Sequence, residues 1–288
     1  MIYYLNISTR FNKTEEKLDF LNRKTMQNNE DANQRLYKKI KNNPQYSFEY
    51  INEILKNILI EENQYFEKIH LDSFNINTNY RYYINPESWK FFINSLINIQ
   101  NLLFFDEHTL FLTVQIFDKY ISEVLYKETN NNIIEENLDI VIVTSLIIAC
   151  KREEIKLYCM KDFLNLLPDK YSIKDLIKQD KDILYKFNFN ILLPNSLNFF
   201  ELFSVICKLN NIQKNKGLYL LNIILLDCYL LKIPPSLIAF CVIKNICKKN
   251  IKTNILNRII NKYNVGNKYK EIKILTIMKD YNMVDNIC

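Results

Sequence analysis

The sequence predicts an all-α fold, and three observations lead to this class. Glycine occurs only twice in the 288 residues, whereas sheet-rich proteins and phosphate-binding loops use glycine at tight turns. The apolar residues recur at helical spacing from about residue 46 onward. They make up 48% of the chain, which is enough to bury the cores of two domains of ordinary size.

The first 85 residues are expected to lie outside the main helical bundles. Residues 1–45 are rich in asparagine, lysine, glutamine and glutamate, and this composition predicts a flexible polar tail. The side chains of Tyr50, Ile54 and Ile58 fall on one helical stripe, so residues 46–85 are expected to form an amphipathic helix and a polar linker. We expect this helix to pack on the bundle that follows it.

A first bundle is predicted over residues 86–193. Pro86 suits the first turn of a helix, Asp106 can cap a second helix, and Ser172 with Asp175 forms a capping-box pattern. The central helix of this bundle is expected to be apolar on nearly all sides, as the sequence between residues 138 and 151 is. Five helices are predicted, near residues 86–103, 106–121, 138–151, 160–167 and 172–187.

A second bundle is predicted over residues 194–288. Residues 236–241 (Ser-Leu-Ile-Ala-Phe-Cys) echo residues 145–150 (Ser-Leu-Ile-Ile-Ala-Cys). A shorter echo precedes each segment, because Asp118-Lys119-Tyr120 is matched by Asp227-Cys228-Tyr229. Two echoes in the same order indicate a duplicated helical unit.

Several kinds of chemistry lack their usual sequence signals. The histidines, His70 and His108, are far apart, and no H-E-x-x-H, C-x-x-C or G-x-x-x-x-G-K-S/T motif occurs, so no metal, other cofactor or enzymatic activity is expected. The net charge of +6 includes no long basic block, so nucleic acid is not an expected partner. No apolar run is long enough to predict a membrane span, and seven cysteines without paired spacing favour a reducing, intracellular location.

The most informative residue is Asp180, because it completes the apolar stripe of the helix predicted at 172–187. The other members of this stripe are Ile173, Leu176, Ile177, Ile183, Leu184 and Phe187. A carboxylate in such a position is costly to bury unless a group donates hydrogen bonds to it. Lys151, which ends the apolar helix at 138–151, can share this surface. Two interpretations remain open: the two residues meet a group of another chain, or both are solvated at the edges of their helices.

Four matches, taken in order, resemble the cyclin family. The third of them consists of Lys161-Asp162-Phe163 followed by Asp180, Leu184, Phe189 and Pro194, which keep the register of the family. The other three are continuous segments. Residues 109–122 (TLFLTVQIFDKYIS) resemble the second helix of a cyclin box, written T-L-x-L-A-V-x-x-x-D-R-F-L-S. Residues 145–155 (SLIIACKREEI) resemble the motif A-x-L-I-A-x-K-x-E-E at the end of the third helix. Residues 229–239 (YLLKIPPSLIA) resemble the sequence Y-L-x-x-x-P-S-x-I-A of a second box.

The resemblance implies two tandem five-helix cyclin boxes, at residues 86–193 and 194–288, with an additional N-terminal helix. It also implies a regulatory subunit without catalytic groups, which binds a cyclin-dependent serine/threonine protein kinase and activates it by holding the kinase's regulatory helix in its active position. The kinase is the expected partner, with no small-molecule ligand, no cofactor and no membrane, in the nucleus or the cytoplasm or both.

The kinase-binding residues follow from matching this chain to the family motifs. Lys151 and Asp180 match the lysine and the acidic residue that hydrogen bond to kinase backbone, although the family usually has glutamate where Asp180 stands. The other residues expected at the kinase contact are Glu154, Ile177, Leu184 and Phe187.

The chain departs from the family on its first box helix. Cyclins that dock R-x-L substrates carry M-R-A-I-L there, whereas this chain has Ser88-Trp89-Lys90-Phe91-Phe92. Because the arginine is lost, Lys90 is expected to form the structural ion pair with Asp118 in its place. Trp89 and Phe92 would form a degenerate substrate-docking patch, with a core position as the alternative for Trp89.

Two other functions remain open at this stage. One is a cyclin-fold scaffold of a transcription complex that contacts DNA or polymerase without activating a kinase. The other is an unrelated helical adaptor.

Overall fold

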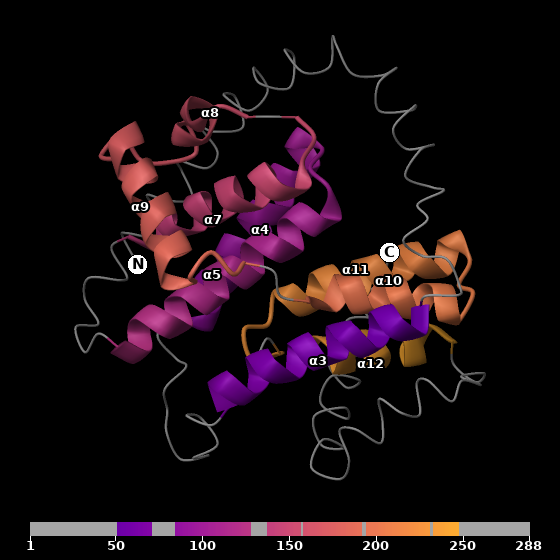
Figure 1. Ribbon diagram of the computed structural model, residues 1–288. Helices are drawn as coiled ribbons and strands as arrows, with labels where there is room; N and C mark the ends of the chain where they lie inside the picture. Colours follow the sequence, from indigo (N-terminus) through magenta and orange to yellow (C-terminus); the bar gives the residue numbers. More distant parts are fainter. Residues whose placement is uncertain are drawn as a thin grey trace. The chain divides into compact units, whose positions relative to one another are not determined.

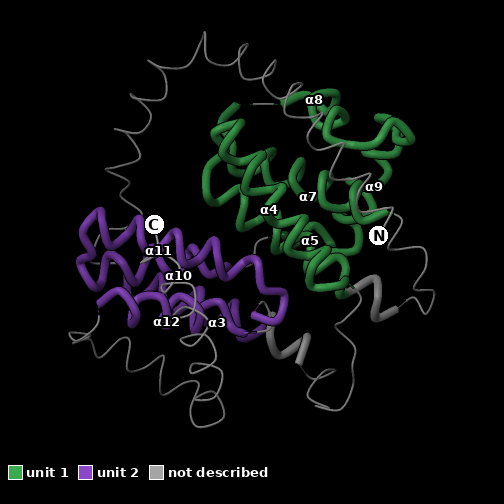
Figure 2. Tube along the Cα trace, turned by 180° about the vertical axis from the view of Figure 1, so that it is seen from behind, with its two compact units in different colours: residues 1–43, 79–191 green, residues 44–78, 192–288 purple. Residues whose placement is uncertain are grey.

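The computed structural model describes residues 51–70, 84–127, 137–156, 158–191, 194–230 and 233–247. All regular secondary structure in these ranges is helical and no β-strand occurs in them, which confirms the all-α class. The helices divide between two compact units, which Figure 2 colours separately. The predicted tail at 1–45 and the part of the second bundle beyond residue 247 lie outside the described residues.

The first unit has a buried helix at its centre (Figure 1). This helix, α7, buries twelve of its sixteen residues and packs against α5, α8 and α9. Burial on every side explains why its sequence is apolar all round. The helices of the unit within the described residues are α4 (Pro86–Leu103), α5 (Glu107–Lys127), α7 (Leu138–Glu153), α8 (Met160–Leu164) and α9 (Ile173–Lys186).

The ends of these helices follow the local sequence signals. The Asn85 side chain accepts a hydrogen bond from the backbone of Glu87, and Pro86 occupies the first turn of α4. The Asp106 carboxylate accepts one from the backbone N of His108 at 2.9 Å, in the first turn of α5. Ser172 and Asp175 form the capping box that starts α9. The predicted start signals are therefore confirmed.

The second unit contains α3 (Ile51–His70), α10 (Ser196–Ile206), α11 (Asn211–Leu225) and α12 (Pro235–Cys247). In this unit α10 buries eight of its eleven residues and α12 eight of its thirteen, and the two helices pack against each other and against α11. The echoed segments at 145–150 and 236–241 are buried throughout, the first in α7 and the second in α12. A Cβ atom on Gly217 would lie 2.1 Å from the Phe200 ring, so glycine allows α10 and α11 to approach closely.

The expectation that the N-terminal helix packs on the first bundle is wrong, because α3 belongs to the second unit and contacts α10. The physical reason is a buried carboxylate, Glu62, which is only 2% exposed. Its Oε1 accepts a hydrogen bond from the backbone N of Ser236, and its Oε2 accepts one from the Ser236 hydroxyl, both at 2.8 Å. The first turn of α12 therefore receives an acceptor from α3.

Candidate functional site

The centre of the candidate site is an ion pair between two neighbouring helices of the first unit. Lys151 lies in the last turn of α7, and Asp180 lies in the middle of α9. The Lys151 ammonium donates to both carboxylate oxygens of Asp180, with Nζ 3.0 Å from each. The Lys151 side chain is 49% exposed, whereas that of Asp180 is 12% exposed.

This geometry shows whether Asp180 is solvated at the edge of its helix, as one of the two interpretations requires. Asp180 is flanked on its stripe by Leu176 and Ile183, which are fully buried, and it is buried itself. It is therefore not a solvated residue at a helix edge. Its desolvation is offset within the chain by Lys151, whose side chain is half-exposed.

Apolar side chains of α9 border the ion pair. Ile177 lies one turn before Asp180 and is 38% exposed, and Leu184 lies one turn after it and is half-buried. We call Lys151, Ile177, Asp180 and Leu184 the Lys151–Asp180 face. It combines a cation, an anion and partly exposed apolar side chains.

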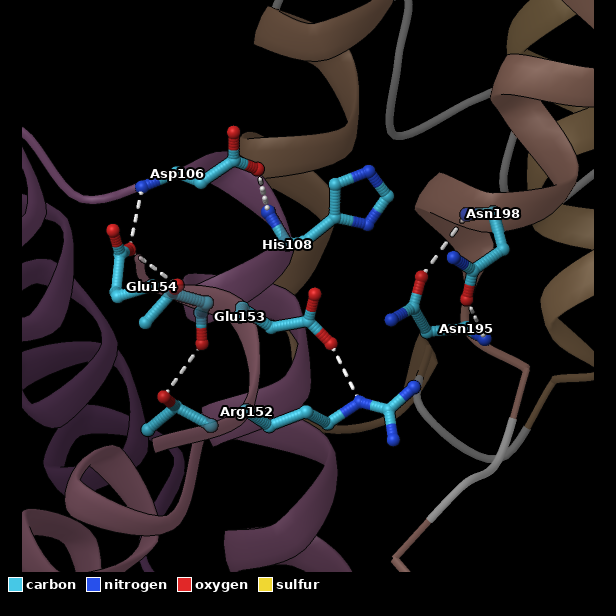
Figure 3. Close-up of polar contacts among 9 residues, drawn as sticks. Asp106, His108, Arg152, Glu153, Glu154, Asn195 and Asn198 are labelled. Carbon is cyan, nitrogen blue, oxygen red and sulfur yellow. Dashed lines mark hydrogen bonds and ion pairs between the residues drawn. The ribbon is translucent and has the colours of Figure 1, made fainter. Parts of the chain in front are cut away.

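Two residues expected at the kinase contact are turned inward. Phe187 is buried, with the Lys119 ammonium 4.1 Å from the centre of its ring, so little of the ring is available to a partner. The Glu154 carboxylate points toward the start of α5 at Asp106, whereas the Glu153 side chain extends toward Arg152 (Figure 3). Its Oε1 accepts hydrogen bonds from the Asp106 backbone N at 2.8 Å and from the Thr109 hydroxyl at 2.5 Å.

The sequence analysis missed an exposed aromatic pair at the end of α9. The rings of Tyr185 and Phe189 meet edge to face with their centres 5.5 Å apart, and both side chains are largely exposed. Phe189 has φ 60°, a left-handed backbone that is uncommon for a bulky residue. Asn188, just before it, is also left-handed with φ 48°, and asparagine after a helix cap is the sequence signal that could have revealed this bend.

The predictions for the first box helix need correction. Trp89 and Phe92 are buried and pack against Phe117, with ring centres 5.6 and 6.1 Å apart, so they are core residues and not a docking patch. The helical turn that buries them leaves Lys90 exposed. The expected ion pair between Lys90 and Asp118 stays a prediction.

No helix within the described part of the chain is long and apolar enough to cross a membrane. The same residues contain no group of three or more histidine, cysteine or acidic side chains that could hold a metal ion.

The family model described as "Cyclin, N-terminal domain" matches residues 53–192, a range that includes the five helices described above for the first unit. The chain belongs to the cyclin family. It is a distant member, 24% identical over 156 residues to G2/mitotic-specific cyclin-2 of Medicago sativa, a match over 54% of this chain and 45% of that cyclin. Cyclins are non-catalytic regulatory subunits of protein kinases, and the expectation that the chain is not an enzyme agrees with this membership.

Other cyclins are similarly distant from this one. G2/mitotic-specific cyclin-B of Dictyostelium discoideum is 24% identical over 241 residues, which cover 84% of this chain and 52% of that protein. S-phase entry cyclin-5 of Saccharomyces cerevisiae is 24% identical over 65% of this chain and 42% of its own length. The chain therefore spans about half or less of these relatives.

A solved structure supports the fold. The X-ray structure of a viral cyclin from herpesvirus saimiri superposes with a TM-score of 0.52 at 15% identity, over 68% of this chain and 85% of the viral cyclin. At this identity the likeness concerns the fold alone.

Proposed function

We propose that this cyclin binds and activates a cyclin-dependent protein kinase through the Lys151–Asp180 face. The observation that carries the proposal is the half-exposed Lys151 side chain, whose ammonium lies 3.0 Å from the nearly buried Asp180 carboxylate. We also propose that residues 86–193 and 194–288 are two tandem cyclin boxes, preceded by an N-terminal helix. In this proposal the protein acts inside the cell, where its kinase partner is.

The chemistry of the pair suits a polypeptide backbone as its partner. An ammonium group has three N–H donors, and a carboxylate can accept about four hydrogen bonds, so the contact between them leaves capacity on both groups. A peptide backbone offers a carbonyl acceptor and an N–H donor side by side. Because α7 and α9 already hold the two groups together, little side-chain freedom is lost on binding.

Activation in this proposal is a population shift in the kinase. A cyclin that binds the active conformation better than the inactive one increases the population of the active conformation. Ile177 and Leu184 would pack against the kinase's regulatory helix and hold it inward. The lysine and glutamate of the kinase can then pair and position ATP.

The test is the substitution Lys151→Ala, with Lys174→Ala as the matched control on an exposed position of α9. Loss of one member of a hydrogen-bonded charge pair at an interface costs about 2–5 kcal/mol, so affinity for the kinase should fall about thirtyfold or more. The assay measures binding and phosphorylation of a histone-type substrate with the purified catalytic subunit of a cell-cycle cyclin-dependent kinase. Unchanged activation by Lys151→Ala contradicts the proposal. Salt-dependent DNA binding without kinase binding would favour the transcription scaffold instead.

A further inference from the structure

Glu154 joins the end of one helix to the start of another. It follows α7 directly, and its backbone N donates to the carbonyl of Cys150 at 3.0 Å, closing the last turn. Its Oε1 accepts from the Asp106 backbone and the Thr109 hydroxyl at the start of α5 (Figure 3). The first backbone N–H groups of a helix lack partners within the helix, so this carboxylate supplies an acceptor that α5 needs.

The junction around Glu154 is partly closed to water. Burial raises the pKa of Glu154, and its hydrogen bonds from Thr109 and Asp106 oppose this shift only in part. Burial also raises the pKa of the Tyr158 hydroxyl to about 12. The Tyr158 ring meets Phe105 edge to face, with the ring centres 5.0 Å apart. Of the two hydrogen bonds of Glu154, the one from the Thr109 hydroxyl is part-buried, so water replaces it less well than the exposed one from the Asp106 backbone.

Lys151 lies on the same last turn of α7 that Glu154 closes. The end of α7 is thus held from two sides, by Glu154 against α5 and by Lys151 against α9. If the Glu154 carboxylate is removed, the end of α7 loses this attachment to the start of α5. This attachment lies within one helical turn of Lys151. The direction of the Lys151 side chain depends on that turn.

We propose that Glu154 is a positioning residue, which fixes the last turn of α7 on α5 so that Lys151 is presented to the kinase, and that it does not contact the kinase itself. The inference rests on the proposed kinase-binding function. It replaces the sequence-based expectation that Glu154 is a contact residue. Both hydrogen bonds end on a single oxygen, so an uncharged amide carbonyl at this position can accept them equally well.

The test compares Glu154→Gln with Glu154→Ala, and uses Glu153→Ala as the matched control on the neighbouring residue. Binding is measured to the same purified kinase subunit. We expect Glu154→Gln and Glu153→Ala to bind like the unaltered protein. Glu154→Ala should bind on the order of tenfold more weakly, which is the loss when the competent arrangement is populated about a tenth of the time. If Glu154→Gln loses as much affinity as Glu154→Ala, the charge contacts the kinase directly and the proposal is overturned.

Hydrogen exchange of residues 150–154 in the free protein separates this proposal from the proposed function. Exchange should be faster in Glu154→Ala and unchanged in Glu154→Gln. Equal exchange in all variants overturns the positioning role, whether or not a kinase binds. If even the unaltered protein binds no kinase, the proposed function fails, and the exchange rates still decide whether Glu154 fixes α7. Should Glu154→Ala fail to fold, the comparison of Glu154→Gln with the unaltered protein still distinguishes direct contact from positioning.

Discussion

Replacing Glu62 by alanine should destabilise the second unit strongly. The side chain is 2% exposed, and its two oxygens accept both polar hydrogens of Ser236, which is itself fully buried. A hydrogen bond to a charged group contributes about 1.5–3 kcal/mol, and a buried donor left without an acceptor costs more than one exposed to water. The two lost bonds should therefore lower the free energy of unfolding by about 3 kcal/mol or more.

Urea denaturation followed by circular dichroism measures this loss, and hydrogen exchange locates it. The Ser236 amide should exchange about a hundredfold faster in Glu62→Ala, which corresponds to about 3 kcal/mol. The matched control is Glu61→Ala, because Glu61 is the exposed neighbour on the same helix. A double-mutant cycle with Ser236→Ala isolates the bond to the hydroxyl and should give a coupling of about 1–2 kcal/mol. The reasoning is refuted if Glu62→Ala and Glu61→Ala shift the urea midpoint equally.

Two further predictions concern packing and pH. Gly217→Ala should lower the thermal unfolding midpoint, because overpacking against Phe200 costs about 1–3 kcal/mol and outweighs the gain of about 1 kcal/mol in helix propensity. Phe200→Leu in the same chain should restore part of the loss, and a raised midpoint in Gly217→Ala alone would contradict the packing argument. Burial raises the pKa of Glu154, so the folded state binds its proton more readily than the unfolded state does. The stability that this proton confers is present below the ordinary glutamate pKa and is lost as pH rises through the raised value. Glu154→Gln lacks this loss. The urea midpoint of Glu154→Gln should therefore rise relative to that of the unaltered protein as the pH increases above the ordinary glutamate pKa, and a relative fall would count against the raised pKa.

The sequence predicts the local structure of the first unit well. Pro86, Asp106 and Ser172 act through neighbours within three residues, so their signals are complete in a short stretch of chain. The burial of α7 follows from its composition alone. Asp180 could be singled out because a carboxylate on an apolar stripe contradicts the helical pattern.

Features that depend on distant parts of the chain escape such reasoning. Glu62 and Ser236 are 174 positions apart, and no local pattern links them. A signal existed nevertheless, since Glu62 continues the buried stripe of Ile51 and Leu55 at helical spacing, as Asp180 does on its own helix. Phe187 and Glu154 are expected at the kinase contact, yet contacts with Lys119 and Thr109 turn them inward. Motif position gives the residue, whereas tertiary packing gives the direction of its side chain.

The burial of Trp89 has a practical consequence. It is the single tryptophan of the chain, and it is stacked on Phe117 inside the first unit. Its fluorescence emission therefore reports on the interior of the first unit and on no other part of the protein. Loss of order in the second unit alone should leave this optical signal unchanged while helical dichroism declines, so the melting of the two halves can be followed separately without an added label.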